Sequence, residues 1–168
     1  MGYVCRSCGE YHAERPVCWK FDVPAIIADF TPEEMEQRVV LGEEQCVVDD
    51  EHFFILANLD IPIQGSIESL RWTVWGSLSK KNFERASDLW ESRGREREPA
   101  YFSWLSNQIP GYSASINIKA LVHTLEVGVR PRIEVIEEGH ALTHDQRDGI
   151  TPERADELIH ESTDPGDT

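Results

Sequence analysis

Hydrophobic and polar residues alternate along several parts of the chain, as expected of strands that bury one face of a sheet. The clearest alternation spans residues 69–78, with Trp72, Val74 and Leu78 on one face and Arg71, Thr73, Trp75 and Ser77 on the other. Similar apolar segments predict further strands at residues 39–41, 45–49, 52–61, 116–127 and 132–136.

Helix-start signals separate these strands. Thr31 is followed by Pro32 and by Glu34, a capping box that predicts a short helix ending near Arg38. The same reasoning predicts helices over residues 80–90 and 151–160, and another beginning at a capping box over residues 143–146, with Thr143 as its cap. A further short helix is predicted over residues 101–105, because Trp104 and Leu105 follow Tyr101 at helical spacing. Because strands and helices follow one another without a regular βαβ order, we predict an α+β fold: a mainly antiparallel sheet packed against three to four helices.

The chain has 168 residues and no internal repeat or long linker, which favours a single domain. We expect this domain to span residues 1–161. Within it, residues 1–22 form an irregular, cysteine-containing N-terminal knuckle packed on the sheet. Residues 162–168 are expected to be a frayed acidic tail.

Acidic residues outnumber basic ones by 31 to 16, which gives a net charge of −15. This charge disfavours nucleic acid and anionic membranes as partners, since both require lysine and arginine. It favours a protein partner with a basic surface, because opposite fields accelerate association. We expect most of the aromatic residues between positions 72 and 104 to close the core, and a partly exposed subset would form a protein-binding patch.

The N-terminal segment carries the sharpest chemical signal, Cys5-Arg6-Ser7-Cys8-Gly9. Two thiolates at this spacing supply half of a tetrahedral zinc site. We predict that His12 and Cys46 complete it, with Cys18 as the substitute for either; His52 and His123 are further candidates. Four protein ligands would make the zinc structural, whereas an open position would make it catalytic.

Other interpretations of the cysteines remain open. Cys18 and Cys46 each have apolar neighbours in sequence and are equally consistent with ordinary buried thiols. A thioredoxin-like role for the CxxC is disfavoured, because no convincing helix follows it. No apolar run of signal-peptide or membrane-spanning length occurs, so we expect reduced thiols and a cytoplasmic location.

Few other motifs indicate a reaction. His140 and His144 have the spacing of a helical metal pair, but the predicted cap at Thr143 would separate them. Residues 111–115 nearly match the serine-hydrolase elbow, yet Ser115 replaces the final glycine and a turn precedes the motif. The sequence also allows Cys46 to be a nucleophile with His52 or His123 as its base, although any chain with cysteines and histidines offers such a pair.

Taken together, motifs spread along the chain resemble the DUF2199 domain family of bacteria. They are Cys5-x-x-Cys8-Gly9-Glu10-x-His12, Gln45-Cys46-Val47-Val48-Asp49, Glu51-His52-Phe53-Phe54, Ile61-Pro62-Ile63, Trp72-x-Val74-Trp75-x-Ser77-Leu78-Ser79, Asn82-Phe83, Pro99-x-Tyr101-Phe102-x-Trp104-Leu105, Pro110-Gly111-Tyr112, Val122-His123, Gly128-Val129-Arg130-Pro131 and Gln146-Arg147-x-Gly149-Ile150. The resemblance covers residues 4–161. It implies one compact bacterial domain and adds weight to Cys5, Cys8, His12 and Cys46 as a set, but it implies no reaction.

The sequence therefore predicts a zinc-stabilised protein-interaction module, of which an inhibitor or immunity-type protein for a basic partner is one concrete form. The alternative is a zinc-dependent, hydrolase-like enzyme with an open metal position. We lean away from the enzyme, because no catalytic motif is present.

Overall fold

The computed structural model describes residues 3–4, 11–12 and 16–163. Its elements are β1 (Tyr3–Val4), β2 (Tyr11–His12), β3 (Cys18–Lys20), the 3₁₀ helix η1 (Ala25–Ile27), α1 (Pro32–Arg38), β4 (Val39–Leu41), β5 (Gln45–Val48), β6 (His52–Pro62), β7 (Ser69–Leu78), α2 (Lys80–Asp88), η2 (Arg95–Arg97), β8 (Tyr101–Trp104), β9 (Lys119–His123), β10 (Arg132–Val135), α3 (Ala141–Asp148) and α4 (Pro152–Thr163). The predicted α+β fold is confirmed: a mixed, mainly antiparallel sheet of eight strands packs with four α-helices.

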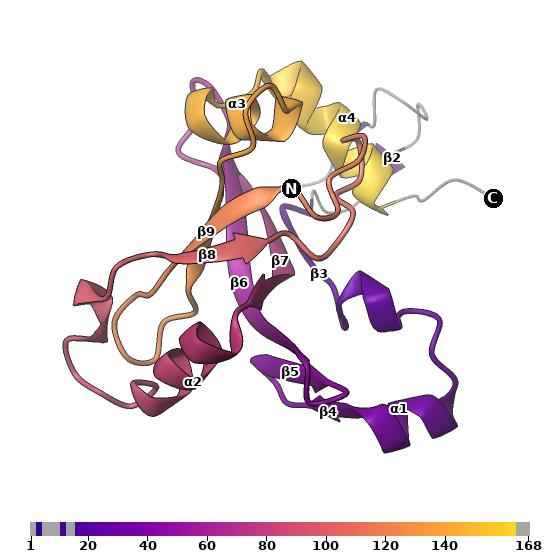
Figure 1. Ribbon diagram of the computed structural model, residues 1–168. Helices are drawn as coiled ribbons and strands as arrows, with labels where there is room; N and C mark the ends of the chain where they lie inside the picture. The colour runs from indigo at the N-terminus through magenta and orange to yellow at the C-terminus, as the bar shows by residue number, and fades with distance from the viewer. Residues whose placement is uncertain (1–2, 5–10, 13–15, 164–168) are drawn as a thin grey trace.

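The long hairpin of β6 and β7 is the spine of the molecule (Figure 1). β3 joins β7 in parallel, and β10, β9 and β8 follow from the other side of β6. The small β4–β5 hairpin adds to the first residues of β6. Helices α3 and α4 lie together at one end of the spine, while α1 and α2 lie at the other end (Figure 1).

The sheet curls until its last strand returns to β7. Gly76 in β7 forms a bridge with Leu105, just after β8. The backbone N–H of Ser106 donates to the carbonyl oxygen of Trp75 at 2.9 Å, which continues this contact. The strands therefore enclose a barrel-like interior, which contains the larger core.

The two faces of the spine support two separate cores. Leu59, Trp72 and Val74 face the barrel interior, and Trp72 stacks on Trp19 of β3 with ring centroids 5.1 Å apart. The opposite face contributes a smaller core outside the barrel, made of Ile27, Cys46, Val48, Phe54, Leu56 and Trp75. This division confirms the faces predicted from the alternation over residues 69–78.

The predicted helix over residues 101–105 is wrong, because these residues form strand β8. Tyr101 and Ser103 are buried, whereas Phe102 and Trp104 are exposed, which is the two-residue period of a strand. Tyr101, Trp104 and Leu105 also fit helical spacing, and in so short a segment the two periods are easily confused.

Two other predicted boundaries differ from the structure. The strand expected over residues 116–127 is shorter, because Asn117 has a left-handed backbone (φ 65°) and β9 begins only at Lys119. The third helix is capped by His140 and not by Thr143, whose hydroxyl instead donates to the carbonyl oxygen of Glu137. By contrast, Thr31 and Ser79 cap α1 and α2 as predicted.

The final helix continues to Thr163 and so passes the end expected near residue 160. The remaining residues of the predicted tail, 164–168, lie outside the described part. None of the helices in the described part combines the length and apolar character needed to cross a membrane.

Candidate functional site

The predicted zinc ligands are only partly described. Cys5 and Cys8 lie outside the described residues, so the cysteine knuckle itself stays a prediction. His12 belongs to β2, which pairs with β1 and lies near α4. Cys46 belongs to β5, at the opposite end of the spine (Figure 1). The structure therefore does not bring the His12 and Cys46 strands together.

Cys46 is completely buried in the smaller core. Burial raises the pKa of its thiol to about 11, because the thiolate would lose its hydration. These surroundings match the alternative interpretation of Cys46 as a core thiol.

Cys18, the substitute ligand, is exposed in β3 beside Arg71. Cys46 lies opposite Phe54, which in turn lies opposite Ser77. Arg71 and Ser77 are separated by about 20 Å along β7, at roughly 3.3 Å per residue. Cys18 and Cys46 therefore belong to different regions of the sheet.

His123 and His140 have local partners. His123 contacts Glu134 through Nε2 at 2.9 Å. The Nε2–H of His140 donates to the carbonyl oxygen of Ser113 while its Nδ1 accepts from the N–H of Leu142, so this histidine is held as a helix cap. Among the described residues, no three His, Cys, Asp or Glu side chains lie close enough together to hold a metal ion.

A concave surface lies on the outer side of the spine, where β7 meets β8. Its first cavity has a volume of about 480 Å³. Its apolar wall consists of Ile26, Phe30, Val48, Phe54, Trp104 and Ile116. Its polar side chains are those of Arg38, Asp49, His52, Ser77, Ser106 and Asn117.

A second cavity of about 320 Å³ adjoins the first. It is lined by Glu51, His52, Phe53, Ser77, Leu78, Ser79, Asn82, Phe102 and Trp104. Because His52, Ser77 and Trp104 line both cavities, the two are contiguous. We call them together the two-cavity groove.

A buried polar loop after β8 holds the wall of the first cavity in place. The side chain of Asn107 accepts from the N–H of Trp75 at 2.8 Å and donates to the carbonyl oxygen of Val23 at 3.0 Å. The N–H of Ala25 donates to the carbonyl oxygen of Ser106 at 2.8 Å. These bonds attach the segment before α1 to the junction of β7 and β8, so the groove is formed in advance of any binding.

Two aromatic rings stand at the border of the groove. Phe102 and Trp104 are each 43% exposed, and their rings meet edge to face with centroids 5.0 Å apart. The N–H of Trp104 donates to the Ser77 hydroxyl at 3.1 Å, which fixes β8 against β7 at this point. Large aromatic side chains held rigidly at the surface are typical anchors of protein interfaces.

The far rim of the first cavity is an ion pair. Arg38, the last residue of α1, donates two hydrogen bonds to the carboxylate of Asp49, at 2.9 and 2.8 Å. Its guanidinium also lies 4.5 Å from the centre of the Phe30 ring. Arg38 holds the pKa of Asp49 below its ordinary value, chiefly through these hydrogen bonds. Both charges are thus mutually compensated, and His52 is left as an exposed polar group with no hydrogen-bond partner among the described residues.

Sequence reasoning found this site only in part. The sequence indicated an aromatic cluster of which a subset could be exposed, and Phe102 and Trp104 are its exposed members. Arg38, Asp49 and Asn117 were missed. The β4–β5 hairpin brings Arg38 beside Asp49, and Asn117 reaches the same cavity only through the return of the chain after β8 to β7. The left-handed residues Asp49 (φ 54°) and Asn117 (φ 65°) belong to types that tolerate this conformation, which is the one available signal.

The curled sheet and its outer groove thus describe an α+β domain with a preformed groove. The chain belongs to a bacterial family described as "uncharacterized protein conserved in bacteria (DUF2199)", whose family model matches residues 4–150. This confirms the resemblance stated above. Every residue of the two-cavity groove lies within the matched range, whereas α4 lies beyond it. Neither the curated proteins nor the solved structures contain a match to this chain.

Proposed function

We propose that this chain is a protein-interaction module that binds an extended, basic segment of a partner protein in the two-cavity groove. The observation that carries the proposal is the pair of contiguous cavities bordered by the exposed rings of Phe102 and Trp104. A wall that combines apolar residues with polar ones suits a partner side chain and its backbone. An extended segment would place alternate side chains, about 6 to 7 Å apart, into neighbouring cavities.

The charge of the chain supports a basic partner. The net charge of −15 provides a long-range attraction for a positively charged surface. An inhibitor or immunity-type protein that covers a basic partner is the concrete form we propose, with the bacterial cytoplasm as its location.

We further propose that Cys5, Cys8 and His12 hold a structural zinc ion. The antiparallel pairing of Val4 with Tyr11 supports this, since it brackets the CxxC between two short strands. For the fourth ligand we favour Cys18 over Cys46, because Cys18 is exposed and Cys46 is enclosed by apolar side chains. Elemental analysis should find about one zinc per chain, lost in Cys5→Ser and Cys8→Ser and retained in Cys46→Ser.

A zinc-dependent hydrolase is the alternative. It would require a water molecule in place of one protein ligand. Spectroscopy of the cobalt-substituted protein distinguishes the two, because a closed set with three thiolates gives strong thiolate-to-metal charge transfer and no response to added anions. Anion-sensitive spectra would favour the enzyme.

The groove proposal is tested with a displayed library of random peptides presented to the purified chain. We expect enriched peptides that combine an aliphatic residue with lysine or arginine. Their affinity should fall about tenfold or more in Trp104→Ala, because hot-spot aromatics contribute about 2 kcal/mol or more. Ile67→Ala is the matched control, since Ile67 is fully exposed in the turn that joins β6 to β7, at the other end of the spine. Peptides whose affinity is equal in wild type and Trp104→Ala would overturn the proposal, as would a library with no enrichment.

A further inference from the structure

The second cavity combines aromatic rings with a carboxylate. Phe102 and Trp104 form its aromatic side, and Glu51 contributes the acidic group. Glu51 takes part in no ion pair within the described part of the chain, although many of the other charged side chains there are paired. Its charge is therefore uncompensated at the edge of the cavity.

The protein places arginine side chains of its own over aromatic rings. Arg38 lies 4.5 Å from the ring centre of Phe30 and is paired with Asp49. Arg95 and Arg154 lie 5.0 and 5.3 Å from aromatic ring centres. In the described part of the chain no such cation lies over Phe102 or Trp104, even though both rings are exposed.

From this juxtaposition we infer that the second cavity is a cation-recognition subsite, which takes the guanidinium or ammonium group of a basic residue of the partner. The quadrupoles of the rings attract a cation over their faces, and the Glu51 carboxylate adds an ionic contact. The inference rests on the proposed function, because the first cavity would hold the neighbouring aliphatic side chain of the same segment.

The test compares two peptides that differ only in charge. The probe is acetyl-Leu-Ala-Arg-amide, whose leucine suits the first cavity and whose arginine suits the second. The comparator replaces arginine with citrulline, which has nearly the same shape but is neutral. Binding is followed through the NMR signal of the Trp104 indole N–H.

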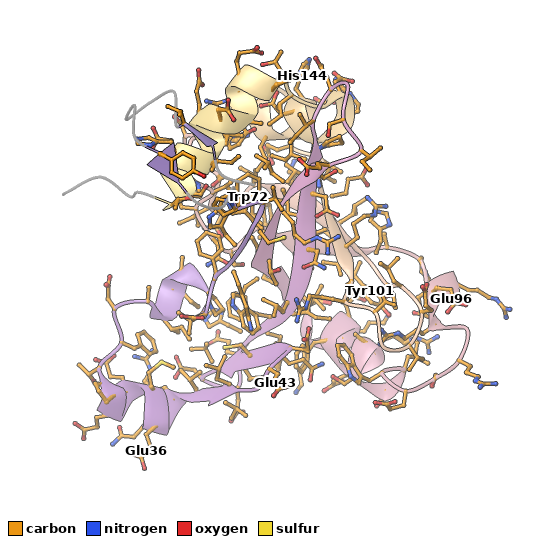
Figure 2. The ribbon with its side chains drawn as sticks, turned by 180° about the vertical axis from the view of Figure 1, so that it is seen from behind. Glu36, Glu43, Trp72, Glu96, Tyr101 and His144 are labelled. Carbon is orange, nitrogen blue, oxygen red and sulfur yellow. The ribbon has the colours of Figure 1, made fainter. Side chains whose placement is uncertain are left out.

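We expect the arginine peptide to bind the wild type about tenfold more tightly, the combined effect of a cation–ring contact and an exposed ion pair. In Glu51→Gln this preference should fall to about twofold, the part that the rings supply. The matched control is Glu36→Gln, which removes an exposed carboxylate on the outer side of α1 (Figure 2). This variant should keep the full preference.

Two results would overturn the inference. If both peptides bind the wild type equally, the second cavity does not recognise a cation, although the groove would still bind peptides. A Trp104 signal unmoved by either peptide would also overturn it. The library selection described above then shows separately whether the groove binds peptides at all.

Discussion

Arg38 and Asp49 are joined by two parallel hydrogen bonds across the mouth of the first cavity, at 2.9 and 2.8 Å. This pair ties the end of α1 to the turn between β5 and β6, directly beside the Val39–Val48 pair of the β4–β5 hairpin, where the N–H of Asp49 also donates to the carbonyl oxygen of Arg38 at 2.8 Å. Because the guanidinium is used in this way, it shapes the groove and does not present a free positive charge to a ligand.

The first prediction concerns the titration of Asp49. Arg38→Gln should raise the pKa of Asp49 toward its ordinary value of 3.8, since the hydrogen bonds that lower it are lost. The folded-state pKa is depressed, so the stabilisation by this pair is present above pH 3.8 and is lost as the pH falls through the lowered pKa.

Carbon-detected NMR of the side-chain carboxyl measures this pKa directly. Arg147→Gln is the control, because it removes the partner that lowers the pKa of Asp148 and should leave Asp49 unchanged. An Asp49 pKa that is the same in wild type and Arg38→Gln would show that the pair does not form in solution.

The second prediction concerns the closure of the sheet at Gly76. A Cβ atom at this position would lie 2.6 Å from the Ser103 Oγ and 3.1 Å from the Ile133 Cδ1. We expect Gly76→Ala to reduce the free energy of unfolding by about 1 to 3 kcal/mol, as in other overpacked interiors.

Urea denaturation followed by tryptophan fluorescence measures the loss. Gly42→Ala is the matched control, because its Cβ would meet its nearest neighbour, the Gln45 carbonyl oxygen, at an ordinary 3.4 Å. Adding Ser103→Ala to Gly76→Ala should restore part of the stability, because it removes the closest atom. If the two glycine variants are equally stable, β7 and β8 do not approach as described.

The third prediction concerns the buried Arg95. Its guanidinium donates to the backbone carbonyl oxygens of Trp90, Leu125, Glu126 and Val129 at 2.8 to 3.0 Å. It thereby fastens the loop between β9 and β10 to the segment before β8. Arg95→Met keeps much of the volume but leaves these carbonyl groups without their donor, so we expect a loss of about 2 to 4 kcal/mol.

Arg95→Lys should be nearly as unstable, because one ammonium group does not reproduce the planar fork. The exposed neighbour Arg93 provides the control, and Arg93→Met should change stability by less than about 0.5 kcal/mol. Full stability in Arg95→Lys would mean that charge alone matters and that the fork geometry does not.

The fourth prediction concerns the two described cysteines. Cys46 is buried with its thiol pKa raised to about 11, whereas Cys18 is exposed. Iodoacetamide at neutral pH should therefore leave Cys46 intact in the native protein, whereas Cys18 should be modified readily once a chelator has removed the zinc that we propose it binds. Peptide mass spectrometry distinguishes the two sites.

A chelator makes this measurement decisive for the role of Cys46. If Cys46 is a core thiol, its protection persists after zinc removal, for as long as the sheet stays folded. Rapid modification of Cys46 once the metal is chelated would instead support Cys46 as a ligand.

The sequence contained much of the fold. Alternation over residues 69–78 predicted both the bounds of β7 and its two faces, because each face contacts a different core. The caps at Thr31 and Ser79 were equally predictable, since capping is a local interaction.

The predictions that were wrong concern segments whose structure depends on contacts with residues distant in sequence. The segment around Trp104 becomes a strand because it pairs with β9 and returns to β7, and neither pairing is visible in five residues. For Cys46 the sequence leaves two interpretations open, because its apolar sequence neighbours fit a core thiol as well as a ligand next to the knuckle. Arg38 and Asn117 line the same cavity only because the sheet curls, so their spacing in the sequence does not predict that they meet.

The most direct test of the central claim is to map a library-selected peptide onto the chain by NMR, using isoleucine methyl and tryptophan indole signals. We predict saturable shifts for Ile26, Ile116 and Trp104, which line the groove, and none for Ile67 at the distant turn. Shifts confined to Ile67 and its surroundings, with the Trp104 indole unmoved at saturation, would contradict the assignment of the groove as the binding surface.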